Sequence, residues 1–485
     1  MAETVTLTRP ENIPYFFING LKDKDILEDI DNVCSYEVQE VERVLAGMQD
    51  KENAAARLEG RQPKPIEWDG KIRLLKRSKN GNYYFPFGLV DRVIRVLRIY
   101  GTDFAVNDGR SRCQSIPEVG SLGSCGEVEL RPYQRDALTK LVSNCYNASG
   151  IISLPTGAGK TIIALFWARM VKGPFWVLVH RKELLDQWHD EIKRLYPGIE
   201  VARIGAGYED KPAFATVAMV QTLANIVKDG KQKFETDLLI MDECHVIPAK
   251  NAYSVGMAFQ AKYRLGLSAT PYRTDGEDLK IFACCGEKAS VVTVEDLVEG
   301  GHITRPTFIM AKIPAADLPH YSSWSNVVRH GITANASRNQ AIEDMARKYL
   351  KEGRQVYIHV NQIMHGQGLK RRLEDVGAEW VCGSTPKKER TRIIEDYKAG
   401  KIPCLVSTLL KEGVSIDGIS CLIYAAGGKS EVATIQTIGR ALRKDPKFDD
   451  AIIIDFMDKG HRYLEEHREQ RIATYRTVYG LLFEY

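Results

Sequence analysis

The sequence predicts an α/β protein in which two parallel-sheet domains follow one another along the chain, preceded by a small α+β domain. From about Val128 to Asp455, short runs rich in valine, isoleucine and leucine alternate with longer amphipathic stretches, the pattern of parallel strands joined by crossover helices. The runs form two sets, separated by residues 301–332, which we expect to be irregular. Residues 1–125 lack this alternation of short apolar runs and amphipathic stretches, which predicts the additional domain.

Each set of apolar runs predicts one sheet. The first set lies at residues 151–154, 175–179, 215–220, 238–241 and 263–268. The second set lies at residues 356–360, 379–382, 403–407, 421–425 and 451–455, and residues 386–398 are expected to form a helix. Open α/β sheets bind ligands at the carboxyl ends of their strands, so the functional loops are expected there.

The N-terminal 125 residues begin with an acidic stretch, residues 25–57, that we expect to be helical. Residues 68–101 indicate strands with a turn at Asn80 and Gly81, followed by a helix. The glycine- and serine-rich residues 111–126 are typical of a linker. The expected organisation is an N-terminal domain and linker at 1–125, parallel-sheet domains at 126–302 and 303–460, and a C-terminal helical tail at 461–485.

The composition is that of a globular chain. The length of 485 residues predicts several folded domains. The contents of 44% hydrophobic and 27% charged residues are typical of globular proteins. No run approaches the roughly 18 apolar residues of a spanning helix, and the N-terminus lacks the features of a signal peptide. Ten scattered cysteines without a CxxC pair suggest reduced core thiols and no zinc site, so we expect a cytoplasmic protein without a membrane partner.

The charge is distributed unevenly. The formal net charge of +4 neither requires nor excludes a nucleic-acid partner. Residues 69–112, however, contain ten lysines and arginines against four acidic residues. The N-terminal domain therefore carries a locally basic segment that could contact a polyanion.

A phosphate-binding loop is predicted at residues 154–161, LPTGAGKT, which follow an expected strand and precede an expected helix. Gly157 and Gly159 allow the backbone to turn its N–H groups toward phosphate oxygens, and the helix N-terminus adds its positive dipole end. Lys160 would bind the β- and γ-phosphates, and Thr161 would offer its hydroxyl to Mg²⁺. The general motif has glycine where this chain has Leu154. A chance glycine-rich turn is the alternative. The candidate nucleotide contacts of the loop are Pro155, Thr156, Gly157, Ala158, Gly159, Lys160 and Thr161.

Paired carboxylates are expected at the end of a second strand. Residues 238–245, LLIMDECH, place Asp242 and Glu243 directly after four apolar residues. Asp242 would hold Mg²⁺ through water, and Glu243 would orient and activate the attacking water. An acidic N-cap before a helix is the alternative. Together with the phosphate loop, the pair predicts a nucleoside triphosphatase.

GAGKT and DECH resemble the corresponding motifs of the superfamily 2 helicases, and four further segments resemble motifs of that family in its order. They are LRPYQ at 130–134, SAT at 268–270, VYIHV at 356–360 and STLLKEGVSID at 407–417. The resemblance implies two RecA-like domains. It also implies that Arg131 and Gln134 bind the adenine and that Gly413 and Asp417 contact ATP. By the same resemblance, the SAT segment couples the ATP state to the affinity for nucleic acid. Its residues are Ser268, Ala269 and Thr270.

QTIGRALR, residues 436–443, matches the sixth motif of the family, Gln-x-x-Gly-Arg-x-x-Arg, at every fixed position. The resemblance places Gln436, Arg440 and Arg443 among the catalytic residues. An arginine supplied from a facing domain accelerates phosphoryl transfer by roughly 10³ to 10⁵. Arg440 and Arg443 are three residues apart, so they would share one face of a helix.

Within the superfamily the chain resembles the UvsW-type branch-migration helicases of tailed phages. WDGKIRLL at 68–75 and FPFGLV at 85–90 resemble their N-terminal DNA-binding domain, and TIGRALRK resembles their sixth motif. The acidic stretch at 25–57 departs from that pattern. The resemblance implies a helicase, using ATP and Mg²⁺, that migrates junctions or reverses forks, and a host bacterial cytoplasm if the chain is viral.

Nucleic-acid contacts are expected in both halves of the chain. The resemblance places backbone contacts at Arg181, Gln221, Thr222, Thr408 and Lys411. In the N-terminal domain, the basic stretch that includes Trp68, Lys71 and Arg73 precedes the aromatic residues Tyr83, Tyr84 and Phe85. This combination suits contact with the backbone of a duplex or junction, with an aromatic ring available for stacking. A strand with a solvated basic face and a buried aromatic face fits the same residues.

The expected function is therefore that of an ATP-dependent DNA helicase or translocase that acts on branched or forked DNA, single- and double-stranded, as a monomeric motor. Two other enzymes remain open: a duplex-translocating subunit of a restriction system and an RNA helicase. A non-enzymatic binding protein built on a decayed ATPase is less compatible with Lys160, Glu243, Arg440 and Arg443, all of which are present.

Overall fold

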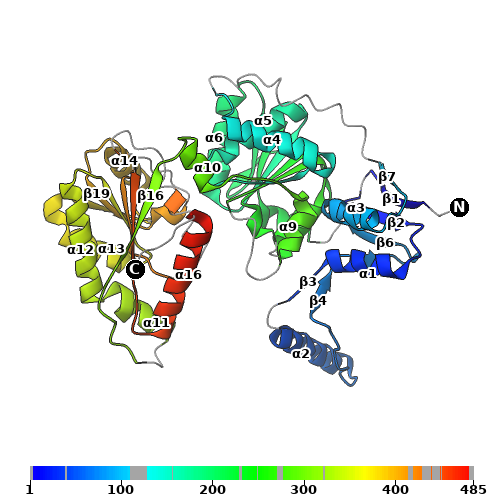
Figure 1. The fold of residues 1–485 in the computed structure, drawn as a ribbon, viewed down its shortest axis with the longest axis horizontal. Helices are drawn as coiled ribbons and strands as arrows, with labels where there is room; N and C mark the ends of the chain where they lie inside the picture. Colours follow the sequence, from blue (N-terminus) through cyan, green and yellow to red (C-terminus); the bar gives the residue numbers. More distant parts are fainter. Residues whose placement is uncertain are drawn as a thin grey trace. The chain divides into compact units, whose positions relative to one another are not determined.

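The computed structural model describes most of the chain (Figure 1). The described residues are 4–11, 13–38, 41–109, 128–155, 157–228, 232–247, 250–269, 277–319, 323–412, 419–428, 438–439, 448 and 450–479. They form two compact units. The first comprises Met1–Ser153 and Thr161–Val291, and the second comprises Val292–Tyr485 with the loop Leu154–Lys160. None of the described helices combines the length and the hydropathy of a membrane span.

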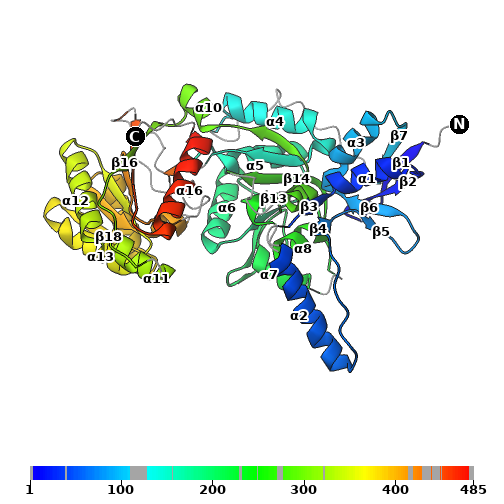
Figure 2. The ribbon, with the colours of Figure 1, turned by 60° about the horizontal axis from the view of Figure 1, so that its bottom comes forward.

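The N-terminal part of the first unit is built on a five-stranded sheet in the order β5-β6-β2-β1-β7. The strands are β1 (Val5–Arg9), β2 (Tyr15–Asn19), β5 (Lys76–Arg77), β6 (Tyr83–Pro86) and β7 (Phe104–Asp108). Burial alternates along β1 and β2, as in a sheet with one covered face. Helices α1 (Lys24–Val33) and α3 (Val90–Ile99) pack on that face and share its core. Both helices lie on the same side of the sheet in Figures 1 and 2.

The acidic stretch at residues 25–57, which is expected to be helical, is helical in two parts. Helix α1 ends at Val33, and a short strand, β3 (Ser35–Glu37), follows it before α2 (Val41–Glu59) begins. The strand interrupts the helix because it pairs antiparallel with β4 (Lys71–Arg73), which buries Tyr36 opposite Ile72. The acidic stretch therefore forms two separate helices.

Helix α2 projects from the rest of its unit in both views (Figures 1 and 2). Ala56 is its only buried residue, so the helix has almost no apolar packing. The returning chain supports it through Gln49, whose side chain donates to the Lys64 carbonyl at 3.0 Å and accepts from the Ile66 amide at 2.9 Å.

The strands expected after residue 68 and the helix that follows them are confirmed as β4, β5, β6 and α3. The turn between β5 and β6 also lies where it is predicted. Gly81 has a φ of 86°, a left-handed conformation that favours glycine. The Ser78 amide donates to the Asn82 carbonyl across this turn at 2.8 Å.

The N-terminal sheet shares a hydrophobic core with the parallel sheet that follows it. A short 3₁₀ turn, Phe87–Leu89, packs tightly enough that a Cβ at Gly88 would lie 2.1 Å from the Phe282 carbonyl oxygen. The buried Arg264 guanidinium lies 4.6 Å from the centre of the Phe87 ring. Arg92 forms an ion pair with Glu287. These contacts make the N-terminal sheet an integral part of the first unit.

An eight-stranded sheet in the order β11-β10-β12-β9-β13-β14-β8-β15 forms the rest of the first unit. Its strands are β8 (Gly150–Ser153), β9 (Phe175–Val179), β10 (Val201–Gly205), β11 (Tyr208–Glu209), β12 (Ala215–Met219), β13 (Phe234–Asp242), β14 (Phe259–Ser268) and β15 (Lys288–Val291). All pairings except β10–β11 are parallel. The five predicted strands are confirmed as β8, β9, β12, β13 and β14.

Helices lie on both faces of this sheet (Figure 1). They are α4 (Pro132–Asn144), α5 (Lys160–Val171), α6 (Lys182–Leu195), α7 (Val220–Ile226), α8 (Lys250–Ala258) and α9 (Asp278–Cys285). The central strand β9 is buried at all five positions, FWVLV, because both of its faces are covered.

The second unit contains a six-stranded parallel sheet in the order β16-β21-β20-β17-β19-β18. Its strands are β16 (Arg305–Ala311), β17 (Val356–His359), β18 (Ala378–Val381), β19 (Cys404–Ser407), β20 (Cys421–Tyr424) and β21 (Asp450–Phe456). Its helices are α10 (Val294–Glu299), α11 (Trp324–Val327), α12 (Ala336–Lys351), α13 (Ile363–Arg372), α14 (Lys387–Lys398) and α16 (Arg462–Tyr479).

The predictions for this sheet are largely confirmed. The five predicted strands are β17 to β21, and the predicted helix at 386–398 is α14. The expectation that residues 301–332 are irregular is wrong in part, because β16 pairs in parallel with β21 and α11 follows it. Phe308, Ile309 and Met310 of β16 are only half-buried, as fits a strand at the edge of the sheet.

A buried ion-pair network attaches α16 to the second sheet. The Arg471 guanidinium donates to both Asp455 carboxylate oxygens, at 2.7 and 3.1 Å, and to Asp458 at 3.2 Å. Tyr475 donates its hydroxyl to Asp455 at 2.7 Å, and Arg338 of α12 binds Asp458 at 2.8 Å. All five side chains are almost completely buried, so the C-terminal helix is an integral part of this unit.

Candidate functional site

The predicted phosphate loop connects the carboxyl end of β8 to the first residue of α5, Lys160. Gly157 and Gly159 have φ values of 88° and 80°, which residues with a Cβ rarely adopt. The Ala158 amide donates to the Pro155 carbonyl at 3.2 Å, which tightens the turn. A left-handed loop at a helix N-terminus is the backbone geometry that binds phosphate. Thr156 lies outside the described residues, and Thr161 is in the first turn of α5.

The acidic pair lies at the same edge of the first sheet as this loop. Strand β14 is between β13 and β8 in the sheet, and the three strands are parallel. Asp242 pairs with Leu267, and the next residue, Ser268, pairs with Ser153, the last residue of β8. The register therefore places Asp242 level with the start of the phosphate loop, two strands away.

The Asp242 carboxylate is held in a defined orientation. Its Oδ2 atom accepts from the Trp188 indole N–H at 2.8 Å, and its Oδ1 atom accepts from the Glu243 amide at 3.0 Å. Trp188 belongs to α6 and is 1% exposed, so packing fixes its ring. The sequence analysis missed Trp188, because nothing in the periodicity of α6 indicates that its indole reaches a strand 54 residues further along the chain.

Glu243, His245 and Ser268 form a second group of contacts. Glu243 has a left-handed backbone, with φ 50° and ψ 54°, so the chain turns sharply at the end of β13. The His245 Nδ1 atom lies 3.3 Å from a Glu243 carboxylate oxygen and 3.2 Å from the Ser268 hydroxyl. A side-chain contact of His245 thus connects the DECH segment to Ser268, the first residue of the SAT segment. Ala269 is half-buried beyond Ser268, and Thr270 lies outside the described residues.

A second histidine lies close to this group. His180 follows β9, the strand next to β13, and electrostatic interactions link it to Glu243 and His245. Burial, with the positive charge of Arg181, lowers the pKa of His180 to about 4. The imidazole is therefore neutral at pH 7, and Glu243 has a polar but uncharged neighbour there.

Arg131 and Gln134, the expected adenine-reading residues, lie at the N-terminus of α4. The Gln134 side chain is 3% exposed, and its Oε1 atom accepts from the Arg131 amide at 2.9 Å in a capping box. This contact fixes the orientation of the side-chain amide of Gln134.

The expected nucleic-acid contacts of the first unit lie together. Strands β9 and β12 pair in parallel with Val179 opposite Met219, so the segments that follow them emerge at one edge. The Gln221 side chain donates to the carbonyl of His180, the neighbour of Arg181, at 3.2 Å. Arg181 and Gln221 are exposed and Thr222 is half-buried. The three residues are thus available at the edge that carries the phosphate loop.

The expected contacts in the N-terminal domain have structural partners. The Trp68 indole N–H donates to the Lys71 carbonyl at 2.8 Å. Arg73 forms ion pairs with Asp69 at 2.5 Å and with Asp31 at 2.9 Å. Two carboxylates therefore offset the charge of Arg73, which weakens the case for Arg73 as a phosphate ligand.

In the second unit, Thr408 directly follows β19 and is half-buried. Lys411 lies in the 3₁₀ turn Leu409–Glu412, and its side chain is not among those described. The remaining candidates also lie outside the described residues. They are Gly413, Asp417, Gln436, Arg440 and Arg443.

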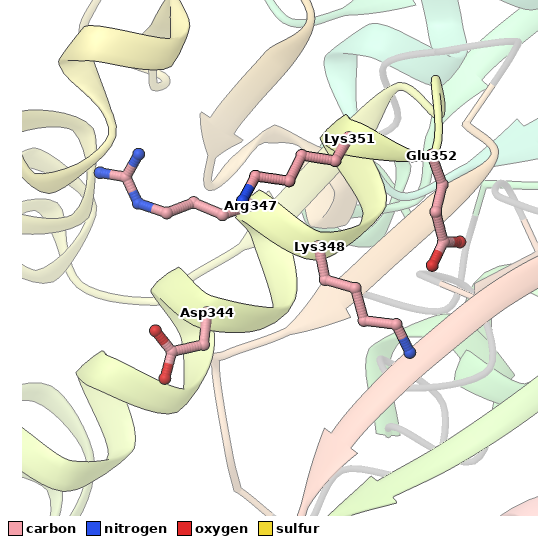
Figure 3. A pocket seen from close by; sticks show the side chains of 5 residues that line it. All are labelled: Asp344, Arg347, Lys348, Lys351 and Glu352. Carbon is pink, nitrogen blue, oxygen red and sulfur yellow. The ribbon is translucent and has the colours of Figure 1, made fainter.

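A surface hollow beside α12 is unrelated to these residues. It is lined by the charged side chains Asp344, Arg347, Lys348, Lys351 and Glu352, all from the last turns of the helix and the residue after it (Figure 3). Since α12 leads into β17, the hollow lies near the amino ends of the strands. Thr408 is at the opposite edge.

Two family models match separate parts of the chain. Residues 127–273 match the family described as "Type III restriction enzyme, res subunit", and residues 337–445 match the "Helicase conserved C-terminal domain". The first range covers the phosphate loop and DECH, and the second covers the last three motifs, at 356–360, 407–417 and 436–443.

Curated relatives align with most of the chain at low identity. The uvsW ATP-dependent DNA helicase of Enterobacteria phage T4 is 24% identical over 424 residues, covering 81% of this chain and 82% of the relative. The XPB2 DNA 3'-5' translocase of Sulfurisphaera tokodaii is 26% identical over 372 residues, covering 69% and 82%. A putative DNA 3'-5' helicase Rad25 of Halobacterium salinarum is 27% identical over 357 residues, covering 71% of this chain but only 56% of the relative. The chain thus spans about half the length of that relative.

Solved structures give weaker likenesses. The crystal structure of T4 UvsW has a TM-score of 0.45 and 21% identity, covering 98% of this chain and 97% of that one. The Hef helicase domain of Pyrococcus furiosus has a TM-score of 0.49 and 17% identity, covering 70% and 98%.

The fold and the motifs place this chain in the class of nucleotide-dependent motor proteins with two parallel-sheet domains. The chain belongs to superfamily 2 of the helicases, and its two parallel-sheet domains are RecA-like.

Proposed function

We propose that this protein is an ATP-dependent DNA helicase or translocase that remodels branched DNA by migrating junctions or reversing forks. The observation that carries the proposal is the alignment of the phosphate loop and the Asp242–Glu243 pair at one edge of the first sheet. This is the arrangement of a nucleoside triphosphatase. The DNA substrate is inferred from the relatives, which include a phage DNA helicase and archaeal DNA 3'-5' enzymes.

The residues of the loop fit the triphosphate of ATP. Gly157 and Gly159 let the backbone amides turn inward, and α5 points its N-terminus at the same position. Lys160 would contribute a positive charge to the β- and γ-phosphates. Arg131 and Gln134 would bind the base, Gln134 through the side-chain amide that the capping box orients.

Asp242 and Thr161 fit a magnesium ion. A carboxylate and a hydroxyl are oxygen ligands of the kind that Mg²⁺ accepts, together with water and phosphate oxygens. The ion would neutralise charge on the phosphates. Trp188 holds the Asp242 carboxylate from the side of α6, so the carboxylate does not have to reorganise when the ion binds.

Glu243 would accept a proton from the water that attacks the γ-phosphate. The left-handed backbone at Glu243 turns the chain at the strand end, and His245 positions the carboxylate. His245 also contacts Ser268, so a shift of the SAT segment can move the carboxylate. We propose that this contact couples DNA binding to ATP hydrolysis.

The sixth motif would complete the reaction. Gln436, Arg440 and Arg443 would reach the nucleotide when the two RecA-like domains close, and the arginines would stabilise charge on the transferring phosphoryl group. Gly413 and Asp417 would contact ATP from the same domain. Cycles of closing and opening would then move the protein along DNA.

DNA would be held without regard to sequence. Arg181, Gln221 and Thr222 in the first RecA-like domain, and Thr408 and Lys411 in the second, would contact backbone phosphates. We propose that the protein works as a monomeric motor in the cytoplasm, that of a host bacterium if the chain is viral. The proposal for branched or forked DNA, with single- and double-stranded parts, rests on the likeness to the T4 uvsW helicase.

The test is the stimulation of ATP hydrolysis by competing nucleic acids. A four-way DNA junction, a linear duplex of equal nucleotide content and a structured RNA are titrated against the full chain. The proposal predicts that the junction stimulates at the lowest concentration. Equal stimulation by linear duplex indicates instead a duplex translocase of the restriction type, and preference for RNA indicates an RNA helicase.

A further inference from the structure

One row of side chains crosses all five strands of the N-terminal sheet on a single face. Directly paired residues lie on the same face of a sheet. Asn107 pairs with Thr8, Thr8 with Phe17, Phe17 with Tyr84, and Tyr84 with Lys76. At about 4.8 Å between strands, the row spans roughly 19 Å, with two aromatic rings side by side and a cation at one end.

This face is the one that the helices leave open. On β1 and β2, Leu7 and Ile18 point to the other face and are 0% and 5% exposed, packed with α1 and α3. Thr8 and Phe17 are half-buried, and on β7 Asn107 is exposed. We call the five residues of the row on this open face the sheet-face row. They are Asn107, Thr8, Phe17, Tyr84 and Lys76.

The aromatic rings of the row are held in place. The Tyr84 ring lies 5.6 Å from the Phe17 ring at 34°, and 5.4 Å from the Tyr15 ring at 87°. Beside them, Asn19 donates its side-chain amide to the Thr8 hydroxyl at 3.2 Å. A ring with two torsions, packed between neighbours, loses little conformational freedom when a ligand stacks on it.

The charge of the face suits a polyanion. In the five strands, every residue of which the structure describes, the one acidic residue is Asp108. Asp108 pairs with Arg9, whose buried side chain is on the covered face. The open face therefore presents the cation of Lys76, and the exposed Lys79 follows in the next turn.

We propose that the sheet-face row binds an unpaired DNA strand, with bases stacked on Phe17 and Tyr84 and the backbone near Lys76. Aromatic rings on an open sheet, flanked by hydroxyl, amide and cationic groups, form a stacking platform for single-stranded nucleic acid. A polyanion suits this face better than a protein surface, because the row ends in the cation of Lys76 and contains no acidic residue. The inference rests on the proposed DNA helicase function, and places a strand-binding surface on the open face of the N-terminal sheet.

The test measures the affinity of the full chain, without nucleotide, for fluorescein-labelled dT20 and for a 20-base-pair blunt duplex. Stacking of one base is worth roughly a tenfold change in affinity. The double variant Phe17→Ala, Tyr84→Ala is expected to bind dT20 at least roughly tenfold more weakly, with a smaller loss for duplex. The matched control is Tyr100→Ala, which removes an exposed tyrosine at the C-terminus of α3 and is expected to bind both probes as the unsubstituted chain does.

Two milder variants separate stacking from a loss of folding. Tyr84→Phe keeps the ring and should bind dT20 normally, whereas Tyr84→Leu keeps an apolar side chain and should bind it more weakly. Unchanged dT20 affinity in the double variant, or equal affinity in Tyr84→Leu and Tyr84→Phe, overturns the inference. ATP hydrolysis by the unsubstituted chain is measured separately, so a failure of the sheet-face row is distinguishable from a failure of the proposed helicase function.

Discussion

The imidazole of His245 connects the ends of two neighbouring strands, because its Nδ1 atom lies 3.2 Å from the hydroxyl oxygen of Ser268. The same atom lies 3.3 Å from the Glu243 carboxylate. The proposed catalytic carboxylate and the SAT segment therefore share one histidine. A change at either strand end can reach the other through a single side chain.

Ser268→Ala tests this connection. Loss of one side-chain hydrogen bond costs about 1 kcal/mol, so the ratio of DNA-stimulated to basal ATP hydrolysis should fall roughly fivefold. Ser268→Thr keeps the hydroxyl and should retain most of the ratio. Steady-state phosphate release with and without DNA checks both variants. An unchanged ratio in Ser268→Ala would show that the contact does not couple the two sites.

Trp188→Phe tests the orientation of Asp242. The change removes the indole N–H that donates to Oδ2 and keeps most of the packing. Residues that orient a metal ligand typically affect metal affinity by about 10- to 100-fold, so the Mg²⁺ concentration for half-maximal ATP hydrolysis should rise by about tenfold. Trp176→Phe is the matched control, since Trp176 is also a buried tryptophan, in β9 of the same sheet, and packs against Phe234 and Phe259. A similar shift in both variants would contradict the assigned role.

Arg471→Ala tests the network that holds the C-terminal helix. The change leaves Asp455 and Asp458 buried without their shared cation, and breaking a buried ion pair costs about 3–5 kcal/mol. Hydrogen exchange of β21 and α16 should therefore lose protection by roughly that amount. Arg347→Ala is the control, because Arg347 pairs with the exposed Asp375 and a surface pair contributes about 1 kcal/mol or less. Equal losses of protection in the two variants would show that the buried network stabilises α16 no more than a surface ion pair does.

His365 predicts a dependence of stability on pH. Burial, with the nearby positive charge of Arg338, lowers the pKa of His365 from 6.5 to about 3. Between these values the unfolded chain binds a proton that the folded chain does not, so stability decreases as the pH falls, by up to about 1.4 kcal/mol per unit. The melting temperature of His365→Asn should fall less steeply from pH 6.5 to 4 than that of the unsubstituted chain. The exposed His330→Asn should leave the slope unchanged, and an equal slope in His365→Asn would count against the mechanism.

The sequence predicts the central strands well and the peripheral ones poorly. Strands β9 and β13 contain uninterrupted buried apolar runs, at residues 175–179 and 238–241, and such runs are visible without a structure. Strands β10 and β16 were missed because VARIG and RPTFIMA contain polar residues and are only partly buried. Strand β3 was missed because three residues carry too little pattern, and its pairing with β4 depends on residues more than 30 positions away.

The candidate site divides in the same way. Glycine spacing and paired carboxylates after an apolar run are local signals, so Lys160, Asp242 and Glu243 could be named from the sequence. Trp188 could not, because its contact with Asp242 depends on how α6 packs against the sheet. The sheet-face row could not be named either, because it joins five strands whose order is not sequential.

The most direct test of the central claim is ATP hydrolysis by Lys160→Ala and Glu243→Gln in the presence of DNA, with DNA binding measured on the same samples. Loss of a general base costs about 10² to 10⁴ in rate, so Glu243→Gln should be at least roughly 100-fold slower, and Lys160→Ala should be similarly impaired. Both should bind DNA as tightly as Lys140→Ala, a control on the exposed face of α4. Turnover at the unsubstituted rate in both variants would show that the phosphate loop and the acidic pair do not form the motor's ATP site.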